Sequence, residues 1–237
     1  MMLITKDQLI GDIVSEDYRA ASIFESFDIE FCCEGDQSLE NVCLQKKIKP
    51  KKILKNLTNL MEENIHSYNF FQAWDVDLLA DYLEKKHNKL LNENIPEISN
   101  LLEKIIKKHK SNARNINDIS VLWKSSAEIF INHMHFEHRE IFPDIRDIKI
   151  KFNEVKSSNI VKNNTKIIIN DLKEEHHIVG KNLKQIAKLT NHFTAEIDDC
   201  NTMKLFFTAM ETFYAEVLLH IHIENNILFP KYIKLIN

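Results

Sequence analysis

Two short segments of the chain, one in each half of its C-terminal part, repeat one arrangement of histidine, glutamate, phenylalanine and proline. Residues 133–143 have the sequence HMHFEHREIFP, and residues 220–230 have the sequence HIHIENNILFP. In each segment a glutamate follows a histidine by four positions, which places both on one face of a helix. A duplicated apolar core would explain the repeated Phe-Pro but not the repeated histidine and glutamate. Each pair can present an imidazole nitrogen and a carboxylate oxygen to one metal ion.

The elements that would carry these pairs are four long amphipathic helices. In each of four segments, apolar residues recur at alternating steps of three and four, which is typical of a helix with one buried face. Each buried face includes a histidine and two include a glutamate, although a buried carboxylate is costly unless a positive or hydrogen-bonding group meets it. A single buried histidine is usually a packing residue, but one on each of four helices indicates a metal site. The predicted metal ligands are His87, His133, Glu137, His176, His220 and Glu224.

The types of the predicted ligands narrow the choice of metal. Imidazole with carboxylate suits iron, manganese or zinc, and the four buried faces contain no cysteine. A structural zinc site closes with four ligands, whereas six side chains are available here. Two carboxylates can bridge two ions roughly 3.5–4 Å apart, which leaves two imidazoles for each ion.

An alternative ligand set follows the Glu-x-x-His pattern of ferritin-type proteins, which occurs at Glu84–His87 and at Glu174–His177. Together with the two glutamates already named, it would give a carboxylate-rich site. It is the weaker alternative, because it leaves two histidines of the buried faces without a role. Histidines two positions after a predicted ligand turn about 200° around the helix, so we expect them in packing or in an outer layer. These are His135 and His222; we also expect His138 to lie off the buried face.

Composition and helix signals predict an all-α fold. The 237 residues include only 3 glycines and 4 prolines, which favours long helices. The four long helices are expected at about 75–93 with a continuation from Pro96 to about 110, at about 117–141, at about 165–190 and at about 202–228. Their lengths and the loops between them favour an antiparallel four-helix bundle.

We predict a small helical domain over residues 1–62, a connector over 63–74 and the bundle over 75–237. In the small domain, Ser15 is predicted to cap a helix, and a second helix is predicted to begin at about Ser38. The net charge of -4 gives no electrostatic reason to expect nucleic acid as a partner. No apolar run reaches the roughly 18 residues of a membrane span, and the N-terminal segment does not have the pattern of a signal peptide. The four cysteines, two of them adjacent, do not fit a secreted disulfide framework. We therefore expect reduced thiols and a cytoplasmic protein.

The sequence resembles a known family, the iron-sulfur cluster repair di-iron proteins, whose larger domain is hemerythrin-like. The resemblance rests on YLEKKHNKL with His87, on EEHHIVG with His176, and on the two repeated segments quoted above. It extends to LIGDIVSEDYRAASIFESFDIEFCCEGDQSLENVC, which holds Cys32 and Cys33 and is similar to the small N-terminal domain of that family. Together these matches cover nearly the whole chain.

The resemblance implies a non-haem di-iron centre in which four histidines hold two iron ions and Glu137 and Glu224 bridge them, often together with an oxo bridge. It implies a stress-response protein that restores iron-sulfur clusters damaged by nitric oxide or oxidative stress, either by donating iron or by removing nitric oxide. Its partners would be the damaged iron-sulfur proteins, with nitric oxide or oxygen as a small ligand. Cys32 and Cys33 are candidates to take electrons, nitric oxide or iron; the alternative is a purely structural pair.

Two other functions are considered beside repair. A hemerythrin-like bundle can be a module that senses oxygen or nitric oxide. It can also be an enzyme that reduces nitric oxide, in which case Glu137 and Glu224 would be the catalytic residues. Phe142 and Phe229 are expected to pack near the site and to limit its access to water. A homodimer is among the candidate assemblies.

Overall fold

The computed structural model describes residues 4–62, 71–109, 115–151, 159–197 and 199–236. Within these ranges the chain forms helices and no strand, and its only extended pairing is an isolated bridge between Leu9 and Ser38. The predicted all-α fold is confirmed. Among the described helices, none combines the length and the apolar character that crossing a membrane requires.

The contacts of the backbone divide the chain into two compact units. One unit comprises residues 1–79 together with residues 220–237, and the other comprises residues 80–219. The domain boundaries expected from the sequence stay a prediction, because such a grouping does not test which parts fold independently. Residues 63–70 of the expected connector lie outside the described residues.

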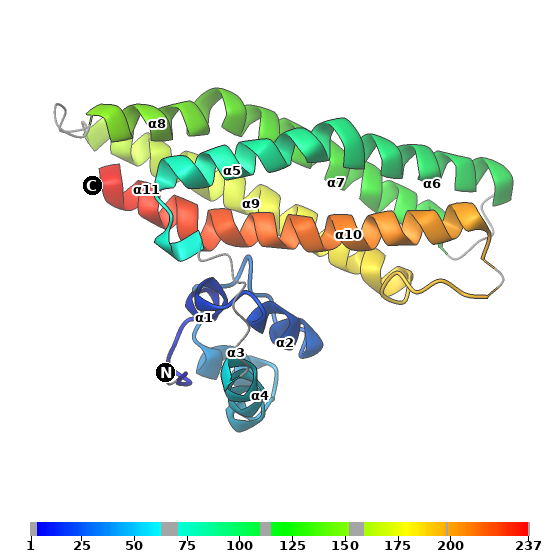
Figure 1. Cartoon of the computed structure of the whole chain (residues 1–237), viewed down its shortest axis with the longest axis horizontal. Coiled ribbons are helices and arrows are strands. Elements are labelled where there is room, and N and C mark those ends of the chain that lie inside the picture. Colours follow the sequence, from blue (N-terminus) through cyan, green and yellow to red (C-terminus); the bar gives the residue numbers. More distant parts are fainter. Residues whose placement is uncertain (1–3, 63–70, 110–114, 152–158, 198, 237) are drawn as a thin grey trace. The chain divides into compact units, whose positions relative to one another are not determined.

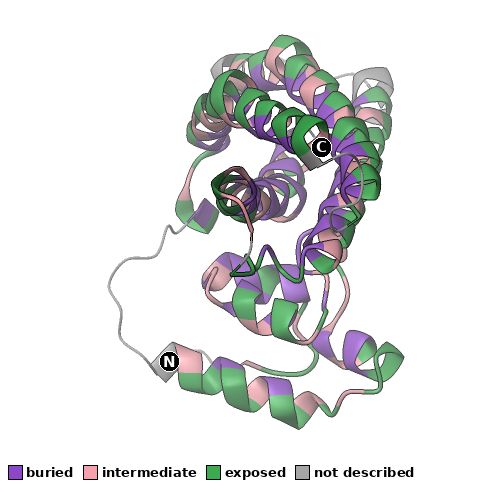
Figure 2. Ribbon diagram, turned by 90° about the vertical axis from the view of Figure 1, so that its right-hand side faces the viewer, coloured by how far each residue is buried: buried purple, intermediate pink, exposed green. Residues whose placement is uncertain are grey.

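Long helices that run in alternating directions build the bundle (Figure 1). In chain order they are α5 (Val76–Lys89), η2 (Leu90–Asn94), α6 (Ile95–His109), α7 (Ile116–Phe136), η3 (Glu137–Ile141), α8 (Phe142–Lys151), α9 (Asn159–Leu189) and α10 (Asn201–Ile223). Helix α7 packs along α9, and α6 packs against α7. Figure 2 shows that the buried residues follow one side of each helix, as the apolar periodicity predicted. The predicted four-helix arrangement is confirmed.

Trp123 connects three of these helices in the core. Its buried ring on α7 meets Phe213 of α10 edge to face, with ring centroids 5.1 Å apart. Its indole N–H donates to the hydroxyl of Ser99 on α6 over 3.0 Å. A buried indole is stable when its N–H finds an acceptor in this way. This contact fixes the end of the bundle that lies away from the predicted ligands.

Three wide π-helical turns interrupt the helices, and a proline follows each. The turns are η2, η3 and η4 (Glu224–Leu228), and the prolines are Pro96, Pro143 and Pro230. In each turn, the residue before the proline donates its N–H to the carbonyl five residues earlier. A proline lacks a donor and its ring clashes with the carbonyl four residues earlier in a regular helix, so we attribute the wider turns to the prolines. The repeated Phe-Pro thus gives Glu137 and Glu224 the first position of a π turn.

The unit formed by residues 1–79 and 220–237 consists of shorter helices. They are α1 (Ile10–Glu16), α2 (Ala20–Ser26), α3 (Leu39–Gln45), α4 (Pro50–Glu62), η1 (Phe71–Ala73), η4, and α11 (Phe229–Ile236). The predicted start of a helix at about Ser38 is confirmed, and Ser38 caps α3 by accepting the N–H of Asn41. The predicted cap at Ser15 is wrong. Ser15 lies inside α1, and its hydroxyl donates to the carbonyl of Gly11 over 2.7 Å. A serine hydroxyl can bond the preceding turn as well as cap the next, and the sequence does not distinguish the two.

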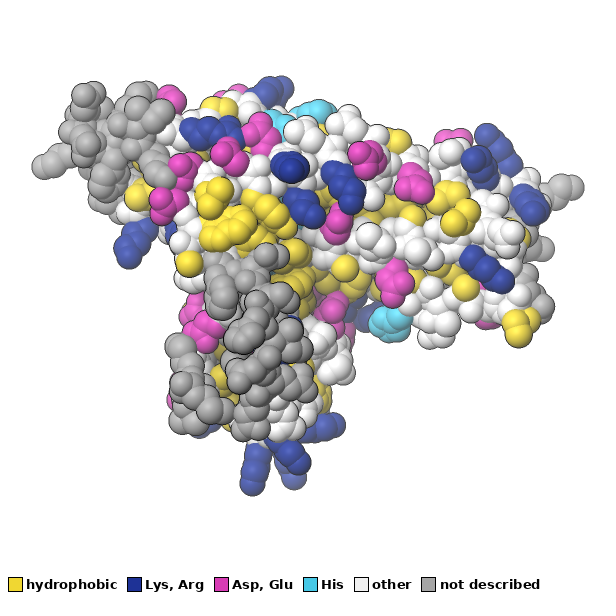
Figure 3. Space-filling model, in the orientation of Figure 1, with side chains coloured by type: hydrophobic (Ala, Val, Ile, Leu, Met, Phe, Trp, Pro, Cys, Tyr) yellow, Lys and Arg dark blue, Asp and Glu magenta, His cyan; other side chains and the backbone are white. Residues whose placement is uncertain are grey.

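Charged side chains of both signs are interspersed on the face of the bundle that Figure 3 shows. An ion-pair network of this kind links α5 to α8, where Arg146 contacts Asp81 at 2.8 Å and also contacts Glu84. Glu84 therefore forms a salt bridge with Arg146 on the outer side of α5.

Candidate metal centre

Each of the four long helices brings one predicted ligand histidine to the interior. His87 lies on α5, His133 on α7, His176 on α9 and His220 on α10. Glu137 and Glu224 are the first residues of η3 and η4. All six side chains are buried, and the most exposed of them, His220, is only 3% exposed. The amphipathic pattern of the sequence therefore correctly predicted that these six residues lie on buried faces of their helices.

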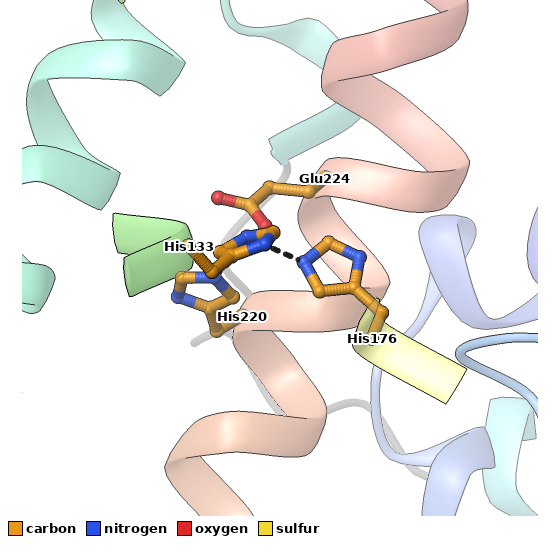
Figure 4. A group of neighbouring side chains, drawn as sticks. All are labelled: His133, His176, His220 and Glu224. Carbon is orange, nitrogen blue, oxygen red and sulfur yellow. Dashed lines mark hydrogen bonds and ion pairs between the residues drawn. The ribbon is translucent and has the colours of Figure 1, made fainter. Parts of the chain in front are cut away.

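Two groups of potential ligand atoms lie among the described residues. One group is His133, His176, His220 and Glu224, and the other is His87, Glu137, His220 and Glu224. Within each group, one nitrogen or oxygen atom of every residue lies within 4.8 Å of those of the others. Figure 4 shows the first group, whose four side chains turn toward one another. The two groups share His220 and Glu224 and together contain all six predicted ligands.

The Nε2 atoms of the histidines supply the close contacts within the groups and between them. His133 Nε2 lies 2.9 Å from His176 Nε2 and 3.3 Å from an oxygen of Glu137. His220 Nε2 lies 2.8 Å from an oxygen of Glu224. Buried carboxylates are stable only beside positive charge or hydrogen-bond donors. Imidazole nitrogens with carboxylate oxygens form a donor set that iron accepts, so the residues present fit an iron site.

The outward-facing nitrogens of two predicted ligands have partners of their own. His133 Nδ1 lies 2.9 Å from a carboxylate oxygen of Glu175, and His87 Nδ1 lies 3.1 Å from Nε2 of His138. The rings of His87 and His138 stack, with centroids 5.1 Å apart. A histidine that binds metal through one nitrogen commonly donates the other N–H to such a partner, which fixes its tautomer and its orientation.

Sequence reasoning missed both of these outer partners. Glu175 precedes a predicted ligand on α9, and only the contact between α9 and α7 shows that it reaches His133. His138 was expected to lie off the buried face, but it is half-buried against His87. The π turn that begins at Glu137 changes the helical register, so a regular helical wheel misplaces the residues that follow. The proline six residues after Glu137 was the only local signal of that change.

The other histidines and the alternative ligand set lie in different surroundings. His135, Glu174 and His177 are exposed, which leaves the ferritin-type pattern without a common interior point. His222 is buried between Tyr18 and Phe31, as expected of a packing residue, and burial lowers its pKa to about 3. The ring of Phe142 is fully buried with its centroid 5.4 Å from that of His87, and Phe229 is also fully buried. That these two rings limit water stays a prediction.

A cavity of about 810 Å³ lies between α7 and α9 and reaches His133. Glu175, Asp171 and Arg139 contribute to its polar lining, and Phe136 and Leu172 to its apolar lining. Glu175 is 42% exposed, whereas the side chain of His133 behind it is fully buried. The cavity is large enough to admit a small ligand or water to the edge of the cluster.

Comparison with known proteins agrees with this geometry. A family model described as the hemerythrin HHE cation binding domain matches residues 78–232. The chain belongs to this hemerythrin family. The hemerythrin domain includes all six predicted ligands, and its cation-binding description together with the cluster of histidine and glutamate suggests iron binding. Residues 6–61 match a second model, ScdA_N, described as a domain of unknown function.

Several curated proteins are similar to this hemerythrin-family chain along nearly its whole length. The iron-sulfur cluster repair protein ScdA of Staphylococcus epidermidis is 24% identical over 230 residues, which cover 97% of this chain and 99% of that protein. The iron-sulfur cluster repair protein YtfE of Musicola paradisiaca is 24% identical, with 95% and 96% covered. A probable iron-sulfur cluster repair protein of Haemophilus influenzae is 29% identical, with 90% of each chain covered.

Proposed function

We propose that this protein repairs iron-sulfur clusters damaged by nitric oxide or oxidative stress, and that it uses a non-haem di-iron centre in its hemerythrin domain. The observation that carries the proposal is the burial of six convergent histidine and glutamate side chains within that domain. Relatives that are similar to this chain along both domains are named as iron-sulfur cluster repair proteins, which supports repair as the use of this site. The protein's partners would then be iron-sulfur proteins, and we place it in the cytoplasm.

Two iron ions, rather than one, account best for the arrangement of the donors. Six side chains converge, and the two groups of potential ligands have His220 and Glu224 in common. Glu137 lies 3.3 Å from His133 and 3.8 Å from His87, which belong to different groups. These contacts support the proposal that both glutamates would bridge the two ions. The four imidazoles are then available as terminal ligands.

The side chains around the cluster orient it and control access to it. Glu175 accepts a hydrogen bond from Nδ1–H of His133 and thereby keeps Nε2 of that ring free to bind a cation. Phe142 packs on His87 and keeps water from that side. The cavity between α7 and α9 gives nitric oxide or oxygen a route to His133. Iron, when bound, supplies the redox change and the affinity for nitric oxide.

The adjacent cysteines are proposed to exchange iron or nitric oxide with clients. Their sulfur atoms lie 3.7 Å apart, and neither is part of a disulfide. A hydrogen bond with Cys33, together with burial, raises the pKa of the Cys32 thiol well above its usual value. A thiolate is the reactive form of cysteine, so a raised pKa makes the Cys32 thiol less reactive. Cys33 is half-buried and is the thiol that would meet a client first.

Recovery of a damaged client tests the proposal. Iron-loaded protein is incubated with a nitrosylated iron-sulfur protein, and the client's recovered activity is compared with that produced by the same amount of free ferrous iron. We expect recovery above the free-iron level, and none above it for the variant with Glu137→Ala and Glu224→Ala. The exposed Glu174→Ala variant is the matched control and should retain activity. Recovery by the wild type that only equals that of free iron would refute repair.

No feature of the described residues favours the two other functions considered from the sequence. Sensing of oxygen or nitric oxide would need only the bundle, whereas the relatives named for repair match both domains. Catalytic reduction of nitric oxide would produce nitrous oxide over many turnovers in the absence of any client. The same preparation can therefore be tested for that product.

A further inference from the structure

The π turn that begins at Glu224 differs from its counterpart at the two positions that follow the glutamate. Asn225 and Asn226 occupy the places that His138 and Arg139 hold in the first repeated segment. His138 contacts a predicted ligand, whereas the two asparagines contact the segment that contains the adjacent cysteines. The divergence within the repeat therefore coincides with a change of partner.

Both asparagine side chains donate to backbone carbonyls of the cysteine segment. Asn225 Nδ2 donates to the carbonyl of Cys32 over 3.1 Å. Asn226 Nδ2 donates to the carbonyls of Phe31 and Cys32 over 3.2 and 3.3 Å. It also lies 3.0 Å from Nδ1 of His222, which is part of the same buried cluster. All five residues belong to one compact unit.

Two glycines make room for the side chain of Asn226. The N–H of Gly11 donates to the carbonyl of Gly35 over 2.8 Å, which holds the two glycines together. A Cβ atom at Gly11 would lie 2.8 Å from Oδ1 of Asn226, and a Cβ at Gly35 would also collide with that oxygen. Neither glycine has a positive φ, so the backbone conformation does not require glycine at either place. The close approach of Asn226, together with that of the backbone carbonyls of Gly35 and Phe31, is the reason that these positions have no side chain.

We propose that Asn226 is a positioning residue that docks the Cys32–Cys33 segment onto the turn that begins at Glu224. Its amide occupies the space beside Gly11 and Gly35, which we call the slot. It holds the backbone of the cysteine segment through the carbonyls of Phe31 and Cys32. The docking turn therefore begins with a proposed metal ligand, and the cysteine backbone is fixed by the next two residues. The use of this docking for exchange between thiols and iron rests on the proposed function, but the docking itself does not.

The rate at which Cys32 is alkylated tests the docking in the full-length chain. Cys32 is only 1% exposed, so iodoacetamide reaches it after the segment opens. Asn226→Ala removes the hydrogen bonds from Asn226 to the carbonyls of Phe31 and Cys32, so alkylation should accelerate roughly tenfold. Asn226→Asp keeps the shape but loses the donor and should accelerate it as well. Arg139→Ala, at the matching position of the first repeat, should leave the rate unchanged.

A double variant tests whether the slot beside Gly11 and Gly35 holds Asn226 in the position that protects Cys32. Gly11→Ala should accelerate alkylation, because its methyl group displaces Asn226. In Gly11→Ala with Asn226→Ala the two effects should not add, because the methyl group no longer meets the amide. A Cβ at Gly11 would also lie 3.0 Å from the backbone carbonyl of Gly35, and a Cβ at Gly35 would lie 2.9 Å from that of Phe31. Gly11 has the less severe contacts and is therefore the position used for this test. If Gly11→Ala lowers expression or stability, the comparison of Asn226→Asp with Arg139→Ala decides alone.

Iron content separates this proposal from the proposed function. Asn226 is not a proposed ligand, so its variants should bind as much iron as the wild type while Cys32 becomes reactive. An unchanged alkylation rate in Asn226→Ala and Asn226→Asp would overturn the docking, and additive effects in the double variant would overturn the slot. A wild type that protects Cys32 but fails to restore a nitrosylated client would refute repair and leave the docking intact.

Discussion

The two repeated segments have the same metal-binding pattern but different surroundings. Glu137 and Glu224 each begin a π turn, each follow a histidine by four residues, and each precede a Phe-Pro pair. Outside that common pattern, the first turn contacts His87 through His138, whereas the second turn holds the cysteine segment through Asn225 and Asn226. The common residues thus build the site, and the residues that differ connect each turn to a different neighbour.

If the common pattern is what binds metal, both glutamates should be needed. Replacement of Glu137 and Glu224 together with alanine should abolish iron binding, because it removes both proposed bridges. Each single replacement should reduce the bound iron to a similar extent. Iron per chain and the absorption spectrum of the oxidised protein measure the effect.

Glu140→Ala is the matched control, since this residue is exposed on the first turn. Full iron content in the double variant would show that neither Glu137 nor Glu224 is a metal ligand. A loss confined to one of the single variants would show that the two turns are not equivalent.

The histidines two positions after His133 and His220 offer a second comparison. His222 is buried and packs against Tyr18 and Phe31, whereas His135 is exposed. His222→Ala should lower the free energy of unfolding by about 2 kcal/mol, through lost packing and unmade hydrogen bonds. His135→Ala should change it by less than about 0.5 kcal/mol. Urea denaturation of the metal-free protein measures both, and equal values would contradict the difference in surroundings.

A third comparison concerns the single residue that directly follows each glutamate. His138→Ala should weaken iron binding roughly tenfold, because it removes the partner that orients His87. Asn225→Ala, at the matching position, should leave iron affinity unchanged. Competition with a chelator of known affinity measures both variants. A similar loss in the two would mean that the turns are sensitive to any substitution at this position.

The helical bundle and the six buried side chains could be predicted because both follow from local periodicity. His133 with Glu137, and His220 with Glu224, share a face by spacing alone, and the apolar residues show that this face is buried. The resemblance to a hemerythrin-like family rested on the same residues and is confirmed by the match to the family model. That these six side chains bind metal stays a prediction.

Contacts between distant parts of the chain could not be predicted in this way. Glu175 reaches His133 only because α9 packs on α7, and Asn226 occupies a slot made by Gly11 and Gly35, which lie near the other end of the sequence. The register change after Glu137 is a local feature, but a regular helical period does not contain it. The proline of each Phe-Pro pair is therefore more informative about the preceding turn than its apolar character suggested.

Trp123 lies in the core of residues 80–219, and Trp74, the other of the 2 tryptophans, belongs to the unit that contains residues 1–79. Each compact unit consequently carries its own natural fluorophore. Emission from Trp123 in a Trp74→Phe background would report melting of the bundle alone, and the reciprocal variant would report the other unit. A difference between the two melting curves would reveal whether the units lose their structure in one step or in two.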